Sequence, residues 1–336
     1  MNEHWIAALA ARGAQLDGLD IPHYGTPANE LAAARDATVV VPLTHLGLID
    51  CAGDDAKSFL HNQLTSDVNH LGAEAVQHAA WCTAKGRMVA SFLVYREAGA
   101  YRALLSADLV AATLKRLQMY VLRSKVKLAD LSEAHALFGL SGAQAEAALA
   151  AADLTLPAQD MHSAASPAGT VLRLAAQRFI VITSAASALP VWDALAAHAT
   201  PAGRPVWQWL DIQAGIPLVC EATREAFVPQ MADFDRIGGV SFHKGCYPGQ
   251  EVVARTQYLG RVKRHLYRLQ SDAPMHAGMP ILSPESPEHA IGMVANAAPA
   301  PDGGYQALAV IQESYISGPL TLATPDGPGF RCAPLA

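Results

Sequence analysis

A cysteine lies in the middle of a short, glycine-rich segment that also carries a basic pair. Residues 243–251 read HKGCYPGQE, so Cys246 follows His243 and Lys244 and precedes a segment typical of a helix start. A nearby ammonium group and the positive end of a helix dipole both favour the thiolate form of a cysteine. The thiolate attacks electrophiles and binds metals, so Cys246 and Lys244, two positions before it, are candidate reactive residues.

The same segment also has a purely structural interpretation. Gly245, Pro248 and Gly249 are typical of a tight turn, and most free cysteines are small buried apolar residues. The spacing alone slightly favours this structural role, because a single cysteine without an evident partner base is a weak signal for catalysis.

Two groups of basic residues contrast with the formal net charge of −6 for the whole chain. Each residue alone is most simply a solvated charge, but the groups together could hold a multiply anionic ligand tail or an RNA backbone. The first group comprises Lys115, Arg116, Arg123, Lys125 and Lys127, and the second comprises Arg255, Arg261, Lys263, Arg264 and Arg268.

An aromatic and polar segment at residues 207–217 could form a different kind of site. One of Trp207 and Trp209 is expected in a core, and the other could stack on a flat heteroaromatic ligand. Gln213 or Asp211 could then bind the amide edge of that ligand through paired hydrogen bonds.

Composition limits the class of protein. A chain of 336 residues suggests two or three domains at about 150 residues each. The apolar fraction of 51% and the charged fraction of 16% are typical of a globular protein. Five widely spaced cysteines with no C-x-x-C argue against a disulfide framework, a zinc site and a cluster-binding run, and they favour a reducing cytoplasm.

The sequence carries no sign of membrane insertion or export. It has no run of about 18 apolar residues, and the N-terminus lacks a basic region followed by an apolar core. We therefore expect a cytoplasmic protein with no membrane contact and no secretory signal.

Hydrophobic periodicity predicts an α+β architecture. Residues 1–36 are expected to form a helical N-terminal extension, and residues 37–133 read as strand, helix, strand, strand, helix, strand, a split β-α-β pattern. Residues 134–260 repeat this pattern, and residues 261–336 show short strands with Gly/Pro turns that predict a small β-barrel.

Two helices have clear local signals. The apolar residues Leu109, Val110, Leu114, Leu117 and Val121 recur at helical spacing and predict a buried helix face. Residues 250–255 are expected to form a second helix, with Gly260 as its stop.

Residues 244–251, KGCYPGQE, resemble the K-G-C-Y-x-G-Q-E signature of the YgfZ family, folate-binding relatives of the glycine-cleavage T-protein, an aminomethyltransferase. The likeness extends from about Val41 to the C-terminus and includes residues 62–67 (NQLTSD), 82–88 (CTAKGRM) and 210–217 (LDIQAGIP). It implies a T-protein-like three-module ring, with two ferredoxin-like units and a β-barrel around a folate cavity.

The resemblance also implies a function, the support of iron–sulfur enzymes, including those that thiolate tRNA, in a tetrahydrofolate-dependent way. The essential family cysteine falls on Cys246, which would act as a transient ligand or a redox-sensitive thiol. One cysteine cannot hold a cluster alone. The expected partners are therefore folate and the iron–sulfur enzymes or cluster-assembly proteins that supply further ligands.

The resemblance assigns the folate contacts residue by residue. The folate-stacking tryptophan falls on Trp207, and Gln213 stands where many relatives have Glu and is expected to bind the pterin edge. Leu46 stands near the place of a second folate-contacting tryptophan. The charge of Arg255 or Lys85, and not the resemblance, suggests a contact with the glutamate tail, and a solvated surface role is an equal alternative for both.

One departure from the T-protein pattern concerns catalysis. Ala90 and Ser91 occupy the place of two consecutive aspartates, and no Asp or Glu occurs between Glu74 and Glu97. Neither side chain can balance charge during carbon transfer, so the resemblance indicates a protein without glycine-cleavage activity.

Two alternatives remain open. A folate-dependent aminomethyl or one-carbon transferase could use a different acid, such as Asp67 or Asp211. An RNA-binding module could instead use the two basic groups, and it would show weak, steeply salt-dependent binding of tRNA.

Overall fold

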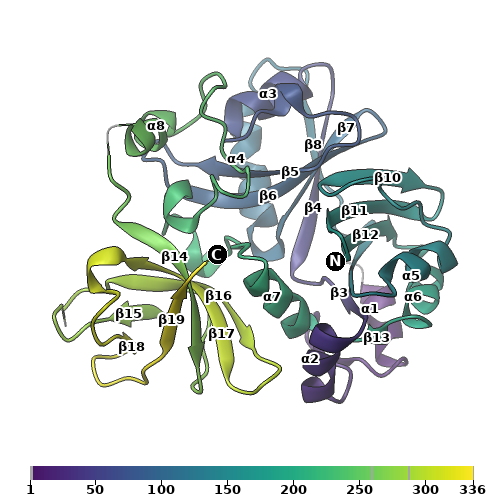
Figure 1. Cartoon of the computed structure of the whole chain (residues 1–336). Coiled ribbons are helices and arrows are strands. Elements are labelled where there is room, and N and C mark those ends of the chain that lie inside the picture. Colours follow the sequence, from purple (N-terminus) through teal and green to yellow (C-terminus); the bar gives the residue numbers. More distant parts are fainter. Residues whose placement is uncertain (1–2, 259, 287, 336) are drawn as a thin grey trace. The chain divides into compact units, whose positions relative to one another are not determined.

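The computed structural model describes residues 3–258, 260–286 and 288–335 and has an α+β fold (Figure 1). The chain forms two compact units. The first contains residues up to 57, 70–77 and 93–207, and the second contains 58–69, 78–92 and the residues from 208 on. Each unit therefore combines segments that are far apart in the sequence, and the expected boundaries at residues 36, 133 and 260 stay a prediction.

A six-stranded sheet in the first unit has the order β10-β11-β12-β9-β3-β13. Its neighbours are antiparallel except for the parallel pair β3–β13. The strands are β3 (Val39–Pro42), β9 (His135–Ser141), β10 (His162–Ser166), β11 (Gly169–Ala175), β12 (Arg178–Ser184) and β13 (Thr200–Pro201), and the helices are α5 (Ala145–Ala151) and α6 (Ala188–Ala196).

Strand β3 pairs with β9. The sequence pattern instead groups residues 38–41 with the first α+β segment, residues 37–133. Strand β3 takes the place beside β9 that the fourth strand has in a ferredoxin-like unit. All four residues of β3 are buried. A continuous apolar strand of this kind is typical of a sheet that is covered on both faces, and the hydrogen bonds of β3 to β9 and β13 fix its place inside the sheet.

A five-stranded sheet has the order β5-β6-β7-β4-β8. Its strands are β4 (Leu46–Ala52), β5 (Gln77–Cys82), β6 (Met88–Glu97), β7 (Ala100–Ser106) and β8 (Lys127–Asp130), and its connecting helices are α3 (Ala56–Gln63) and α4 (Val110–Val121). The order β6-β7-β4-β8 is the ferredoxin-like arrangement predicted from the sequence. The expected stripe on α4 is buried at Leu109, Val110, Leu114 and Leu117.

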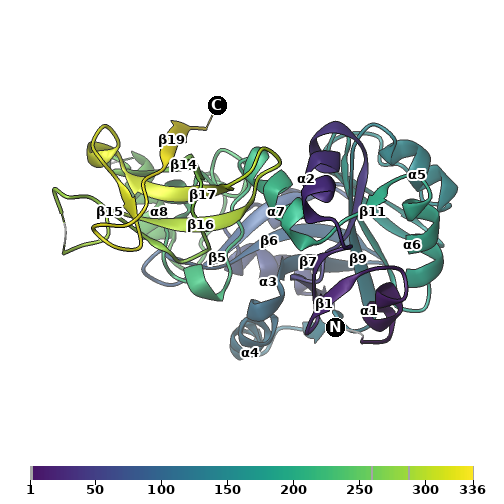
Figure 2. The ribbon, with the colours of Figure 1, turned by 90° about the horizontal axis from the view of Figure 1, so that it is seen from below.

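The C-terminal sheet in the second unit is an antiparallel half-barrel with the order β18-β15-β16-β17-β14-β19 (Figure 2). Its strands are β14 (Arg264–Ser271), β15 (Pro280–Leu282), β16 (Gly292–Pro299), β17 (Tyr305–Gln312), β18 (Thr321–Leu322) and β19 (Arg331–Pro334). Leu269, Ile281, Val294, Ala309 and Ile311 fill its core. The small barrel predicted from the short strands is thus present as a half-barrel.

The N-terminal segment, expected to be helical, contains two helices separated by a hairpin. The elements are α1 (Glu3–Ala10), β1 (Gln15–Asp17), β2 (Asp20–His23) and α2 (Pro27–Asp36). Trp5 of α1 enters the core of the first unit, where its ring meets Phe138 at 5.5 Å, and Phe138 meets Trp192 at 5.4 Å. Buried aromatic side chains thus hold this segment on the unit.

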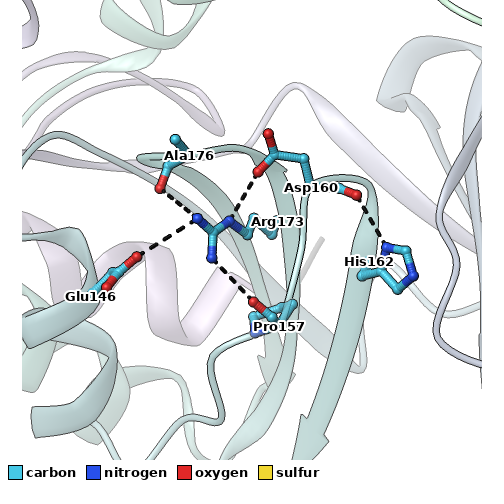
Figure 3. A network of polar contacts seen from close by, with 6 residues as sticks. All are labelled: Glu146, Pro157, Asp160, His162, Arg173 and Ala176. Carbon is cyan, nitrogen blue, oxygen red and sulfur yellow. Dashed lines mark hydrogen bonds and ion pairs between the residues drawn. The ribbon is translucent and has the colours of Figure 1, made fainter.

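A polar network around Arg173 of β11 holds a loop against the same sheet (Figure 3). Its guanidinium donates to Asp160 Oδ1 at 3.0 Å and to the carbonyls of Pro157 and Ala176, each at 3.3 Å. Glu146 of α5 lies 3.8 Å away. One arginine therefore connects a strand, a helix and the loop between them.

The remaining helices are α7 (Arg204–Gln213), α8 (Gln250–Tyr258) and the short 3-10 turns η1 (Val68–His70), η2 (Ala107–Leu109), η3 (Glu221–Thr223), η4 (Pro229–Ala232) and η5 (Glu313–Tyr315). Within the described ranges, none of the helices has the length and apolar character that a bilayer crossing requires.

Candidate functional site

The cysteine segment lies in the second unit and leads directly into α8. Cys246 is exposed, so the purely structural interpretation of a buried thiol does not apply. The helix expected at 250–255 is present, with Glu251 in its first turn. After it, the N–H of Gly260 donates to the carbonyl of Arg255 at 2.8 Å. The thiol is therefore accessible and lies four residues before a helix N-terminus.

Two glycines bring the cysteine segment against the turn that carries Lys85. Gly249 has φ +82, and a Cβ at this position would lie 2.3 Å from the carbonyl oxygen of Thr83 and 2.7 Å from Cα of Gly86. Gly86 has φ +70 and packs on Val252 of α8. Both the backbone conformation and the close approach require glycine, so the two motifs meet backbone to backbone.

Lys244 binds the end of α3. Its ammonium group donates to the carbonyl oxygens of His61 and Leu64, and it lies 4.9 Å from the centroid of the Tyr247 ring. Burial lowers the pKa of Lys244 to about 8, and Asp67 opposes this shift. The lysine thus completes the C-terminus of a helix, and its predicted influence on the thiolate stays a prediction.

A histidine and an aspartate lie beside the same loop. His61 Nδ1 is 3.2 Å from Asp67 Oδ1, and His61 Nε2 is 3.6 Å from the place that a Cβ on Gly245 would take. Thr65, between them in the sequence, donates from its hydroxyl to Gly239 O at 2.5 Å. Residues 62–67, 82–88 and 244–251, separate in the sequence, therefore meet in one local assembly.

The two cations proposed for an anionic tail belong to this assembly. Lys85 is exposed in the turn closed by the bond from Gly86 N to Thr83 O, at 2.9 Å. Arg255 is exposed on α8, one turn beyond Val252, which packs on Gly86. Because both side chains are exposed, their charges remain hydrated in the folded protein, and folding incurs no desolvation cost for them. They are therefore available to an anionic group.

Gln213 at the end of α7 lies against the C-terminal half-barrel. Its amide donates to Gln306 Oε1 at 2.7 Å, an oxygen that also accepts from Trp209 Nε1 at 2.8 Å. Arg268 donates to the carbonyl of Gln213 at 2.9 Å. Among the described residues, the buried atoms Arg268 Nε and Asn296 Oδ1 have no hydrogen-bond partner. Such atoms are what a polar ligand would satisfy.

Trp207 lies in the first unit and is only 2% exposed. The guanidinium carbon of Arg178 lies 4.4 Å from the centroid of its ring, and a Cβ on Gly139 would lie 2.3 Å from ring atom Cε3. This is the environment of a packed core tryptophan with a cation on one face. A pterin could stack on that face only in place of Arg178.

Ala90 and Ser91, predicted from the sequence to stand at the place of the two aspartates of T-proteins, are buried in β6. Ala90 is 0% exposed, and the Ser91 hydroxyl accepts a hydrogen bond from the backbone N–H of Val219 at 2.9 Å. The Ser91 hydroxyl thus binds the main chain at Val219. Leu46 is half-buried at the start of β4, where it pairs with Ser106.

No group of three or more His, Cys, Asp and Glu side chains that could hold a metal ion occurs among the residues of the described ranges.

Several residues at these sites were not predicted. Gln306, which pairs with Gln213, and Arg178, which covers Trp207, lie in strands at distant sequence positions. Arg268 was placed in a basic surface group but is half-buried and binds α7. Sequence periodicity alone gives no signal for such long-range pairings.

The whole chain has the fold of a known class. It superposes on the glycine cleavage system aminomethyltransferase T from Bartonella henselae with a TM-score of 0.82, over 98% of this chain and 95% of that one, at 16% identity. The family model of the GCVT N-terminal domain matches residues 3–167. The chain therefore has the fold of the glycine cleavage system aminomethyltransferase T.

Sequence similarity gives the family within this class. The chain is 33% identical to the tRNA-modifying protein YgfZ of Shigella sonnei over 74% of this chain and 76% of that protein. It is 35% identical to the protein of the same name from Cronobacter sakazakii over 72% and 74%. The chain belongs to the YgfZ family.

Proposed function

We propose that this protein binds tetrahydrofolate or a related folate in the cytoplasm and supports the assembly or repair of iron–sulfur enzymes through Cys246. Enzymes that thiolate tRNA are among those served, in keeping with relatives named tRNA-modifying proteins. The observation that carries the proposal is the exposed thiol in the family's signature segment, at the entry to α8.

The chain supplies one thiol and its local scaffold. An accessible thiolate can take a terminal position on a cluster or react with an oxidised sulfur species, while the partner provides the other ligands. Lys244 fixes the loop by binding the end of α3, and Gly249 holds it against the Lys85 turn. A rigid loop keeps the thiol exposed at low entropic cost when a partner binds.

Folate has suitable polar partners at the end of α7. The unsatisfied Asn296 Oδ1 and Arg268 Nε are buried beside the Gln213 segment and could accept from and donate to a pterin edge. Lys85 and Arg255 carry the positive charge suited to the glutamate tail. When bound, a reduced folate would supply one-carbon or redox chemistry.

The test of the cysteine is genetic and enzymatic. We expect a Cys246→Ala strain to lose activity of its iron–sulfur enzymes, whereas Cys332→Ala, which removes a half-buried thiol, should retain it. Full activity of the iron–sulfur enzymes in the Cys246→Ala strain would refute the proposed role.

The test of folate binding uses tryptophan fluorescence during titration with tetrahydrofolate. Stacking of the pterin on Trp207 predicts quenching that is lost in Trp207→Ala, and an edge contact predicts weaker binding in Gln213→Ala. Quenching that survives the Trp207 substitution would move the pterin away from that ring, and an absence of binding by the wild type would remove folate from the proposal.

The alternative is a folate-dependent aminomethyl or one-carbon transferase. The buried Ala90 and the bonded Ser91 speak against it, because neither supplies a carboxylate. We expect no turnover with tetrahydrofolate and an aminomethyl donor, and product formation that depends on Asp67 or Asp211 would favour the transferase.

A further inference from the structure

The outward face of α4 and the turn after it combine exposed apolar and basic side chains. Seven large apolar side chains are exposed among the described residues, and three of them lie within four positions here: Met119 (71%), Tyr120 (43%) and Leu122 (88%). The inward face of the same helix is buried at Val110 and Leu114. The exposed side chains therefore do not contribute to the core of the first unit, and core packing does not explain their presence.

The charge of this surface is opposite to that of the whole chain. Lys115, Arg116, Arg123, Lys125 and Lys127 are all exposed, and no Asp or Glu occurs between residues 110 and 129. An ion pair connects Lys125 to Asp54 at 3.2 Å. Because the full chain has a formal net charge of −6, this concentration of positive charge gives an anionic partner a defined place to bind.

Helical spacing interleaves the two kinds of side chain. Lys115 lies one turn before Met119, and Arg116 lies one turn before Tyr120, so each cation neighbours an apolar side chain on the same face. A half-exposed tyrosine beside an arginine is a suitable platform for a stacked base.

The turn that follows α4 holds a leucine in an unfavourable conformation. Leu122 has φ 46 and ψ −106 and is 88% exposed, although a positive φ is an unfavourable backbone conformation for a bulky residue that is not glycine. A depression of about 720 Å³ beside it is lined by Asp55, Leu122, Arg123 and Ser124. Residues with a strained backbone cluster at functional sites, and here such a residue is exposed at the edge of a depression.

We propose that this surface binds a single-stranded segment of RNA. The five cations contact phosphates, and Tyr120, with Met119 and Leu122, contacts the bases. A bilayer would require a broad apolar face, whereas here cations outnumber apolar side chains. The inference depends neither on folate nor on Cys246, because all its residues lie in the first unit and Cys246 lies in the second.

The experiment measures fluorescence anisotropy of a labelled single-stranded RNA of about 12 nucleotides and of unfractionated tRNA. We expect the double variant Lys115→Ala/Arg123→Ala to bind at least about tenfold more weakly, with the slope of log K against log salt reduced by about 1.4 for two lost phosphate contacts. The matched control Arg261→Ala/Lys263→Ala removes the same charge from exposed residues of the second unit and should stay within about twofold of the wild type.

Two further variants separate RNA recognition from folding. Tyr120→Ala should weaken RNA binding about tenfold through lost stacking. Leu122→Gly should leave the midpoint of thermal unfolding unchanged or raise it, because glycine tolerates the backbone angle, and yet should weaken RNA binding.

The proposal is overturned by any of four results. These are no RNA binding by the wild type at about 50 mM salt, equal losses in the two double variants, unchanged affinity in both Tyr120→Ala and Leu122→Gly, and preferential binding to phosphatidylglycerol vesicles through the same residues. Each result can occur whether or not Cys246 and folate act as proposed.

Discussion

At the scale of single residues, the five cysteines differ in what surrounds their sulfur atoms. Burial raises the pKa of the Cys51 thiol and of the Cys82 thiol to about 12, and it raises that of Cys332 to about 11. Cys246 is the exposed member of the set. Reactivity should therefore be concentrated at one position, since only accessible thiolates react.

We predict that iodoacetamide at about pH 8 alkylates Cys246 well before the buried cysteines, because their thiols stay protonated and inaccessible under these conditions. Peptide mass spectrometry over time gives the order of labelling. The Cys246→Ser variant should lose the fast phase, and a fast phase that persists in this variant would contradict the prediction.

A second residue prediction concerns Gly249. Alanine there would have to adopt φ +82 and place its Cβ 2.3 Å from the carbonyl oxygen of Thr83. We expect a loss of more than about 2 kcal/mol in the free energy of unfolding, since the positive φ alone costs about 1–2 kcal/mol. Denaturant unfolding measures this loss.

Gly303 is the matched control for Gly249. It has a similar φ, +89, but no atom lies within 4 Å of the place that its Cβ would take. Gly303→Ala should therefore show the conformational cost without the clash. Equal losses for the two variants would mean that the contact between the two motif segments does not contribute to stability.

At the scale of elements, Lys244 connects the cysteine loop to the C-terminus of α3. The pKa of this lysine is lowered to about 8, chiefly by burial, whereas the unfolded value lies near about 10.4. Between these values the unfolded state binds more protons than the folded state. The lysine's contribution to the free energy of unfolding therefore increases as the pH rises through this window.

We predict that the stability of the wild type relative to Lys244→Met rises between about pH 8 and pH 10, by up to about 1.4 kcal/mol for each pH unit. Urea unfolding of both proteins at pH values inside and below this window gives the comparison. A relative stability that is flat or falls across the window would show that the ammonium group is not desolvated in the folded state.

Capping residues and hydrophobic periodicity predicted individual helices and strands. They did not predict which strands pair with one another. The helix at 250–258 has its start and stop within a few residues, and the face of α4 has its own periodicity, so both were predictable. The place of β3 beside β9 and the hairpin β1–β2 depend on partners far along the chain or on short turns. A pattern of three apolar residues does not specify which sheet they join.

The residues of the candidate site also fall into those that short motifs predict and those whose surroundings depend on long-range packing. Cys246, Lys85 and Arg255 lie in or beside short motifs and are exposed on one local assembly, and their binding role stays a prediction. The buried setting of Trp207 under Arg178 arises from packing between strands and a helix. The sequence specifies the residue type at a position, but only the fold determines which side chains pack on it.

At the scale of the whole molecule, the chain has the T-protein fold, and we predict that it lacks the acidic pair of T-proteins. The residues predicted to stand at that place, Ala90 and Ser91, are buried and non-acidic. The same architecture can support different chemistry, because function resides in particular sites placed on a fold. We propose that the functional group in this chain is the exposed thiol of Cys246 in the second unit rather than a carboxylate on β6.

Acid sensitivity of the folded molecule should depend on His45, between β3 and β4. Both of its ring nitrogens are buried, and burial, together with the charge of Arg204, lowers the pKa of His45 to about 3. In the unfolded chain a histidine takes up its proton near about pH 6.5. Between these values the unfolded state binds more protons, so the free energy of unfolding falls as the pH falls.

We therefore predict that the wild type loses up to about 1.4 kcal/mol more stability per pH unit than His45→Gln when the pH is lowered from about 6.5 to about 4.5. Urea unfolding at several pH values measures the difference, and His243→Gln, which removes an exposed histidine, is the control and should follow the wild type. If His45→Gln loses stability on acidification as steeply as the wild type, then His45 is not the group whose buried neutral form limits stability in acid, and the protonation of other side chains must account for the unfolding.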